Sequence, residues 1–154
     1  MAHLVAPQKS RPTLPVFYNV DAVVGASPAA NNREDVLLVQ FAFAAMAANP
    51  LPGASTEFYK AISAVKPTGT IDQATVYAIK ATQIEVKKSQ PNTVVDGRVS
   101  PATGSYSYGG GLFTITHLNE SVQHRYLELW PRIDKIPGCP LELKQMVVRT
   151  VQGT

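Results

Sequence analysis

Two tyrosines in a glycine-rich stretch are the side chains whose type and spacing best suit contact with a ligand. Tyr106 and Tyr108 lie within residues 103–111, which read TGSYSYGGG and include four glycines. Glycine lets a backbone approach a ligand closely, and exposed tyrosine rings can stack on sugar faces. The same composition is typical of a surface hairpin or linker, so both interpretations stay open. A phosphate-binding loop is excluded, because the Gly-Lys-Ser/Thr sequence of such loops is missing.

The acidic and hydroxyl-bearing residues do not form a recognisable catalytic set. The acidic residues include three pairs that helix caps or solvated faces explain: Glu34 and Asp35, Glu120 and Glu128, and Asp134 and Glu142. Glycoside cleavage needs two carboxylates that converge across a sugar, and the sequence does not indicate such a pair. The G-x-S-x-G motif of a nucleophile elbow is also missing. We therefore expect a protein that is not an enzyme and has no catalytic residue.

Cysteine and histidine are too sparse for a metal site. Cys139 is the only cysteine, and with His3, His117 and His124 it gives no compact set of ligands. His117 and His124 lie two helical turns apart, but no carboxylate completes a site. A single cysteine excludes an intrachain disulfide, and the neighbouring Pro140 favours a small semi-buried residue over a nucleophile. We expect no metal and no cofactor.

Length and composition indicate one globular domain with extensions. The chain has 154 residues, 45% of them hydrophobic, and a net charge of only +3. Its basic residues are scattered, and a solvated helix face explains Lys80, Lys87 and Lys88, so we expect no nucleic-acid partner. No apolar run approaches the roughly 20 residues that span a bilayer.

The first 31 residues are predicted to form an extended arm. Prolines 7, 12 and 15 oppose helix, and the apolar residues between Leu14 and Val24 need a surface to pack against. That surface is either the protein's own core or a partner. The start, MAHLVAPQKS, lacks the apolar core of a secretory signal. We expect the protein in the cytoplasm, or delivered to the cell envelope by a route that needs no such signal.

Hydrophobic spacing predicts three helices between residues 32 and 104. The first, 36–48, is apolar nearly all round and should be the central core helix, with Gln40 as a buried hydrogen-bonding residue. Asn32 and Asp35 resemble a capping box at its start. The other two helices have capping residues at their starts and are 56–65, after Ser55, and 73–89, after Asp72. Asp96-Gly97 then predicts a tight turn.

The region beyond residue 104 is predicted to be a Gly/Tyr loop followed by a helical extension, 105–154. The spacing predicts a strand at 112–115, a helix at 120–130 capped by Asn119, and a last helix at 141–151 that begins after Pro140. Before the Gly/Tyr loop, Ser100-Pro101 resembles the start of a short helix. Trp130 fits a core or interface anchor better than a sugar platform.

Residues 32–103 resemble the peptidoglycan-binding-domain-like family, a small helical module of bacterial and phage cell-wall proteins. The first family segment is matched by Gly69, Ile71, Thr75, Ala78, Ile79 and Gln83, and the second by Asp96, Gly97, Val99, Pro101 and Thr103. The family's upstream helix is matched by Val36, Val39, Gln40 and Phe43. Four positions depart from the family pattern: Thr68, Asp72, Thr82 and Ser100.

This resemblance implies a mainly α fold with a three-helix core, and a non-catalytic protein that binds peptidoglycan. The ligand-binding residues are then expected around the second turn and the tyrosine loop: Gln83, Asp96, Gly97, Arg98, Tyr106 and Tyr108. Arg98 would pair with a carboxylate of a peptide stem. The alternative is a structural or adaptor subunit of a phage, secretion or injection machine. It would use the fold as a scaffold and contact a partner, or a second copy, through residues 14–24 or the C-terminal helices.

Overall fold

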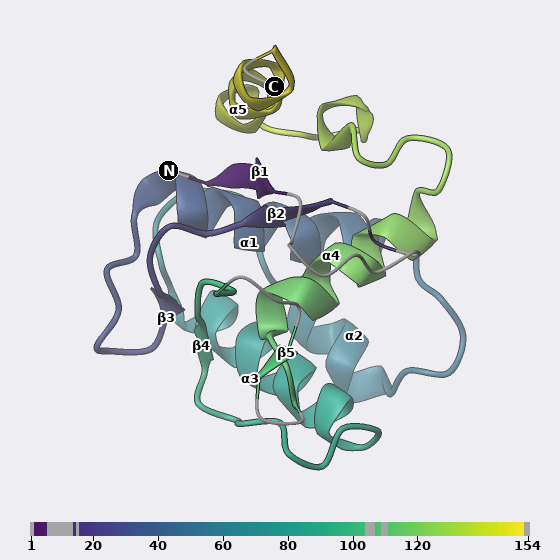
Figure 1. Ribbon diagram of the computed structural model, residues 1–154. Helices are drawn as coiled ribbons and strands as arrows, with labels where there is room; N and C mark the ends of the chain where they lie inside the picture. The colour runs from purple at the N-terminus through teal and green to yellow at the C-terminus, as the bar shows by residue number, and fades with distance from the viewer. Residues whose placement is uncertain (1, 6–13, 15, 104–106, 109–110, 153–154) are drawn as a thin grey trace.

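The protein is mainly α-helical, as the sequence predicts. The computed structural model in Figure 1 describes residues 2–5, 14, 16–103, 107–108 and 111–152. The helices in these residues are α1 (Arg33–Ala48), α2 (Thr56–Ser63), α3 (Gln73–Lys87), α4 (Thr114–Arg125), α5 (Leu141–Gln152) and the 3-10 turn η1 (Ile133–Lys135). The strands are short and pair antiparallel in twos: β1 (His3–Val5) with β2 (Phe17–Asn19), β3 (Val24–Gly25) with β4 (Arg98–Val99), and β5 (Ser107–Tyr108) with β6 (Gly111–Leu112).

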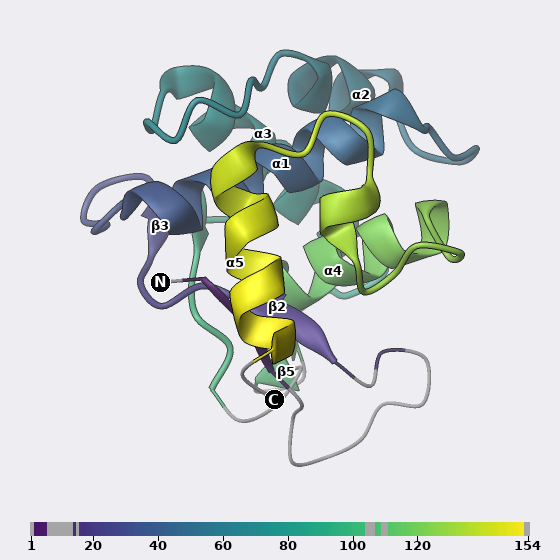
Figure 2. The same ribbon diagram turned by 90° about the horizontal axis from the view of Figure 1, so that it is seen from above.

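Helix α1 is the centre of the hydrophobic core, as its nearly uniform apolar sequence predicts. It contacts α2, α4 and α5, which lie around it in the two perpendicular views of Figures 1 and 2. Val36, Val39 and Phe43 are fully buried. A helix surrounded in this way needs apolar side chains on most of its circumference. None of the described helices combines the length and apolarity that a membrane span requires.

The caps predicted for the next two helices are confirmed. The Ser55 hydroxyl accepts a hydrogen bond from the backbone N–H of Phe58 at 3.2 Å, and Asp72 Oδ1 accepts one from the N–H of Thr75 at 2.8 Å. These side chains satisfy donors that a helix start leaves free. Asn32 is the N-cap residue of α1, as predicted, but its side chain makes no capping hydrogen bond, so the predicted capping box does not form. Asp35 instead accepts from the backbone of Asp21 and Ala22, at 3.1 Å each.

The apolar residues of the N-terminal segment pack on the protein's own core. Phe17, Tyr18 and Val20 are at most 2% exposed, and Val24 is fully buried. Strand β2 contacts α4, while β1 contacts α5, so the segment lies between helices rather than free in solvent (Figure 2). The sequence left open whether these residues pack on the protein's own core or on a partner, and the structure shows them on the core. A partner cannot use these side chains unless the fold opens.

Helix α4 begins six residues earlier than the sequence pattern predicts. It starts at Thr114, so only Leu112 of the predicted strand at 112–115 is in a strand, β6, and Asn119 lies inside the helix. The Asn119 side chain bonds the backbone of Tyr18 instead of capping. Its Oδ1 accepts from the Tyr18 N–H at 2.7 Å, and its Nδ2 donates to the Tyr18 carbonyl at 2.8 Å. Local spacing does not reveal this partner, because it lies 101 residues away in the chain.

The end of α4 and the segment before it also differ from prediction. The helix stops at Arg125, and Trp130 follows in a turn, where its ring packs edge-on against Tyr18 at 5.7 Å between centroids. Residues 100–103 form no helix. Ala102 is held there by Asn19, whose side chain accepts from the Ala102 N–H and donates to its carbonyl, both at 3.0 Å.

Helix α5 completes the core rather than standing apart from it. Leu143, Met146 and Val147 are fully buried, and the helix contacts α1, β1 and η1. Two ion pairs join it to the start of α1: Arg33 with Glu142 at 2.7 Å, and Arg149 with Glu34 at 3.1 Å. These pairs are exposed, so we assign most of the attachment to the apolar face.

Substitution of Phe17 by alanine should destabilise the whole domain. The ring is 2% exposed within the core, so its loss leaves a cavity and should lower the free energy of unfolding by about 3 to 5 kcal/mol. Urea denaturation followed by circular dichroism measures the change. Leu127→Ala is the control, because Leu127 is 69% exposed and should change stability by at most about 0.5 kcal/mol. Equal stabilities of the two variants would show that the N-terminal segment is not part of the core.

Candidate functional site

The predicted turn at Asp96-Gly97 is present and forms a rigid corner of the molecule. Gly97 has φ +71°, a backbone conformation that glycine adopts readily. Asp96 Oδ1 accepts a hydrogen bond from the backbone N–H of Arg98 at 3.0 Å, which closes the turn. Arg98 then enters β4, which pairs with β3. We call residues 96–98 the corner.

Gln83 on α3 holds the corner in place. Its side chain is 2% exposed, and its Oε1 accepts from the backbone N–H groups of Asp96 and Gly97 at 3.1 and 3.0 Å. Its Nε2 donates to Asp96 Oδ1 at 3.1 Å, the Arg98 carbonyl at 2.9 Å and Thr114 Oγ1 at 3.1 Å. An amide used so fully has little capacity left for a ligand. Gln83 therefore positions the site residues.

Gln40 on α1 holds an earlier turn in the same way. Its Oε1 accepts from the Gly69 N–H at 2.8 Å, and its Nε2 donates to the Thr70 carbonyl at 3.0 Å and Thr75 Oγ1 at 3.1 Å. The two turns also share a sequence pattern, since GTIDQAT begins at Gly69 and GRVSPAT begins at Gly97. A search for internal repeats would have found this signal. The buried role predicted for Gln40 is confirmed.

Gly25 allows the N-terminal segment to touch the corner directly. The backbone N–H of Ala26 donates to the Gly97 carbonyl at 3.0 Å, and a Cβ on Gly25 would lie 2.1 Å from that oxygen. Asn31 fixes Gly25 from the other side, accepting from its N–H at 2.7 Å and donating to its carbonyl at 3.1 Å. The corner is therefore supported from this side by a backbone contact that leaves no room for a side chain on residue 25.

Arg98 lies beside a hollow of about 200 Å³. The hollow is lined by Gln83, Val94, Asp96, Arg98, Ser100, Phe113 and Thr114. About a third of the Arg98 side chain is exposed, with Nε 3.7 Å from Asp96 Oδ2 and Nη1 3.5 Å from the Ser27 carbonyl. Both contacts are long, so the guanidinium keeps donors available for an anionic group. The structure thus brings four predicted residues together: Gln83, Asp96, Gly97 and Arg98.

A second, shallow groove reaches the corner from α3. Its volume is about 950 Å³, and it runs between residues 25–31 and the N-terminal half of α3. Small and aliphatic side chains dominate it, including Ala26, Ala29 and Val76. Tyr77 borders it with 61% of its surface exposed. Sequence analysis did not single out Tyr77, although its place opposite the buried face of α3 was a usable signal.

The two tyrosines of the glycine-rich stretch are not placed at the corner by the described residues. Tyr106 lies outside the described residues. The backbone of Tyr108 is in β5, where it pairs with Gly111 of β6. The described residues of the stretch therefore pair as two short antiparallel strands, which agrees with the hairpin interpretation. Tyr77 supplies an exposed aromatic ring beside the corner.

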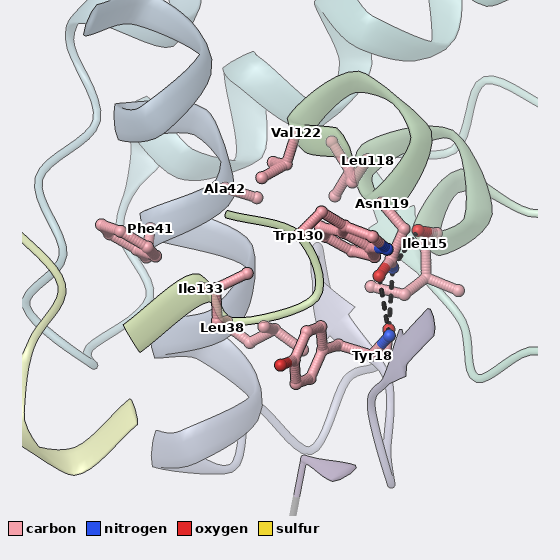
Figure 3. A pocket seen from close by; sticks show the side chains of 10 residues that line it. All are labelled: Tyr18, Leu38, Phe41, Ala42, Ile115, Leu118, Asn119, Val122, Trp130 and Ile133. Atoms are coloured by element: carbon pink, nitrogen blue, oxygen red, sulfur yellow. Dashed lines mark hydrogen bonds between the residues drawn. The ribbon is translucent and has the colours of Figure 1, made fainter. Parts of the chain in front are cut away.

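The cavity in Figure 3 is a packing feature rather than a ligand site. It holds about 20 Å³ between α1, α4 and residues 130–133, room for about one water molecule. Tyr18 donates its hydroxyl hydrogen to the Pro131 carbonyl beside it, and burial raises the pKa of this phenol well above its usual range. The indole N–H of Trp130 is buried and has no hydrogen-bond partner in the described part of the chain. Trp130 is partly buried against the core, as an anchor would be.

The cysteine and histidines do not form a reactive or metal-binding centre in the described part of the chain. No three His, Cys, Asp or Glu side chains gather there in a way that could hold a metal ion. Cys139 is 7% exposed, and burial raises the pKa of its thiol to about 11. It therefore stays protonated at neutral pH and is a poor nucleophile. His117 on α4 is neutral at the same pH, because burial, Arg125 and His124 lower its pKa to about 4.

No protein-family model matches the chain, and the searches of curated proteins and of solved structures returned no match.

Replacement of Gln83 by leucine should loosen the corner. The change removes five hydrogen bonds and leaves the buried N–H of Gly97 without its partner, so we expect a loss of about 2 to 4 kcal/mol in unfolding free energy. Urea denaturation measures the loss, and amide hydrogen exchange at residues 96–99 localises it. Gln73→Leu on the exposed face of α3 is the matched control and should be nearly neutral. Unchanged exchange at the corner would contradict the role given to Gln83.

His117 should make stability fall in mildly acidic solution. Its pKa is about 4 in the folded protein and near 6.5 in the unfolded chain, so the unfolded state takes up the proton first. Stability is then complete above about pH 6.5 and declines as the pH falls to about 4, by about 1 to 3 kcal/mol. In the His117→Gln variant this part of the decline should disappear. His124→Gln, at an exposed position, should keep most of the decline, because His124 is the smallest of the three causes of the lowered His117 pKa. A decline that persists in His117→Gln and disappears in His124→Gln would disprove the assignment.

Proposed function

We propose that this protein is a non-catalytic binding protein that recognises bacterial cell-wall peptidoglycan through a peptidoglycan-binding-like domain at residues 32–104. The observation that carries the proposal is the corner, where Gln83 fixes Asp96, Gly97 and Arg98 beside the 200 Å³ hollow. A rigid site suits binding, because little ordering free energy is lost when the ligand arrives.

The chemistry around the corner suits a strand that combines peptide carboxylates with neutral sugar rings. Arg98 offers charge-assisted hydrogen bonds to a stem carboxylate on the side of the 200 Å³ hollow. Tyr77 offers an exposed ring on the side of the longer groove, whose small side chains allow a bulky chain to lie close to the backbone. Such contacts are individually weak, so useful retention depends on several acting together.

The groups at the corner favour binding over bond cleavage. Asp96 is engaged by Gln83, by the Arg98 backbone and by the Arg98 side chain. It is therefore poorly placed to act as a general acid or base, which needs a free proton-accepting position near the substrate. No second carboxylate lines the 200 Å³ hollow among the described residues. Glycoside cleavage in the usual manner would need two.

A structural or adaptor role is the alternative, and the outer face of α3 favours it. Tyr77 and Ile84 lie seven residues apart on this helix, with 61% and 52% of their surfaces exposed. Large exposed apolar side chains at helical spacing are common where a partner protein docks. In this alternative, the longer groove beside Tyr77 would hold a segment of another protein instead of a glycan strand.

Retention on purified sacculi tests the proposal. Wild-type protein should sediment with sacculi, and Arg98→Ala should weaken retention about tenfold, because a charge-assisted hydrogen bond to a carboxylate is lost. Tyr77→Ala should weaken it several-fold. Arg149→Ala, which removes an exposed arginine paired with Glu34 on α1, is the matched control and should bind like wild type.

Two outcomes would count against peptidoglycan binding. One is no sedimentation of the wild-type protein, and the other is retention that the Arg98→Ala and Tyr77→Ala changes leave intact. The molar mass measured by light scattering then tests the structural or adaptor role. A mass that rises with concentration, and that returns to the monomer value in Tyr77→Ala or Ile84→Ala, would favour a scaffold that uses the outer face of α3.

A further inference from the structure

A second hollow lies between α2, α4 and the C-terminal end of α3. Its volume is about 390 Å³, within the range of sites that hold small ligands. It shares no lining residue with the 200 Å³ hollow at the corner. We infer that this hollow, here called the α4 groove, binds an uncharged sugar ring of the pyranose type. The inference is independent of peptidoglycan recognition at the corner.

The inner part of the α4 groove is apolar. Met46, Phe58, Val86 and Leu112 line it, and each is at most 7% exposed. Phe58 and Val86 come from α2 and α3, so the groove lies over the contact between these two helices. A pyranose ring has an apolar face formed by its C–H groups, and an apolar surface of this kind can cover that face.

Charged side chains of both signs line the α4 groove, and Glu85 and Arg125 already have protein partners. Glu85 Oε1 accepts from Ser55 Oγ at 2.5 Å and from Lys88 Nζ at 2.8 Å. Arg125 donates to the Ser121 carbonyl at 3.0 Å and to the Tyr59 hydroxyl at 2.8 Å. Glu120 adds a second carboxylate to the lining. An anionic ligand would meet two carboxylates, and a cationic one would meet Arg125, so the lining favours an uncharged ligand.

Neutral hydrogen-bonding groups complete the lining. Ser89 and Gln90 contribute from the turn that follows α3, and His117 and Ser121 from α4. The Ser121 hydroxyl lies 3.3 Å from His117 Nε2, so the pair offers one donor and one acceptor. His117 is uncharged at neutral pH. Hydroxyl groups both donate and accept, so a sugar can use all four side chains without leaving one of them unpaired.

The outer wall of the α4 groove is fixed in advance. The Tyr59 hydroxyl bonds both backbone groups of Leu51, accepting from its N–H at 2.7 Å and donating to its carbonyl at 3.0 Å. Asn49 Nδ2 donates to the Arg125 carbonyl at 2.7 Å. These bonds tie the loop at residues 49–54 to α4 through Arg125 and Tyr59. A wall held in this way keeps the groove open before a ligand binds.

Three monosaccharides of similar size and different charge test the inference. N-acetylglucosamine is neutral, glucosamine is cationic at about pH 6, and glucuronate is anionic. We expect N-acetylglucosamine to bind with a Kd on the order of 1 mM, and the two charged sugars to bind at least about tenfold more weakly. Titration of the full chain followed by ¹H–¹⁵N spectra should shift amide signals at residues 85–90 and 117–125, but not at 96–100.

Two small substitutions separate the α4 groove from the corner. Ser121→Ala and Gln90→Ala should each weaken N-acetylglucosamine binding about fivefold, the loss expected for one neutral hydrogen bond. Ser100→Ala is the matched control, because Ser100 lines the corner hollow, and it should leave binding unchanged. Each variant is first checked for wild-type thermal stability.

The inference is overturned if none of the three sugars shifts the amide signals of the α4 groove, or if a charged sugar binds as tightly as the neutral one. Signals that move only at residues 96–100, or an affinity sensitive to Ser100→Ala alone, would place the sugar at the corner. That result would disprove the α4 groove and leave the proposed peptidoglycan binding intact. If the protein is not retained on sacculi but the sugar binds at the α4 groove, the proposed peptidoglycan binding is disproved and the α4 groove inference stands.

Discussion

The fold depends on carboxamide side chains that satisfy buried backbone groups. Its strands have only two or three residues, so neighbouring strands alone cannot pair every buried N–H and carbonyl. Three asparagines each bond both the N–H and the carbonyl of one other residue: Asn19 with Ala102, Asn31 with Gly25, and Asn119 with Tyr18. Gln40 and Gln83 likewise bond backbone groups at the turns that contain Gly69 and Gly97. An amide offers a donor and an acceptor side by side, as a peptide group does.

The same constraint links the N-terminal segment to the corner and to α4. Asn31 holds Gly25 against Gly97, while Asn19 and Asn119 attach β2 to Ala102 and to α4. Residues far apart in sequence thus form one network around α1. The N-terminal segment and α5 close the hydrophobic core on the face opposite α2 and α3, as Figure 1 shows. A three-helix module with separate appendages is therefore an incomplete description of how the molecule packs.

Local patterns predicted the parts of the fold that local interactions decide. Ser55 and Asp72 bond amides three residues away, so their capping role is visible in the sequence. Asp96-Gly97 predicted the corner for the same reason. Asn119 and Asp35 have equally good capping chemistry, but their partners are Tyr18 and the Asp21 backbone. At both positions a distant partner outweighed the local capping preference. At Asn119 the helix starts earlier than the cap predicts.

The candidate site, like the fold, was predictable only where local sequence decides the structure. Sequence pattern located the corner, but it could not show that the Gln83 amide already bonds the backbone of the corner, or that the Tyr77 ring is exposed on the longer groove. The α4 groove has no local signature at all, because residues from four separate segments line it. Its polar members, such as Gln90 and Ser121, look like ordinary surface residues when they are taken singly.

The asparagine at position 119 has a consequence for the molecule's behaviour in concentrated solution. A strand that stays unpaired on one side is a template on which another chain can add itself, and this is a common first step toward aggregates. In β2 the two backbone groups of Tyr18 are taken by a side chain from a helix. A side chain ends the ladder, because it presents no further backbone for a neighbour to extend. The short sheet is thereby closed to growth at this residue without another strand.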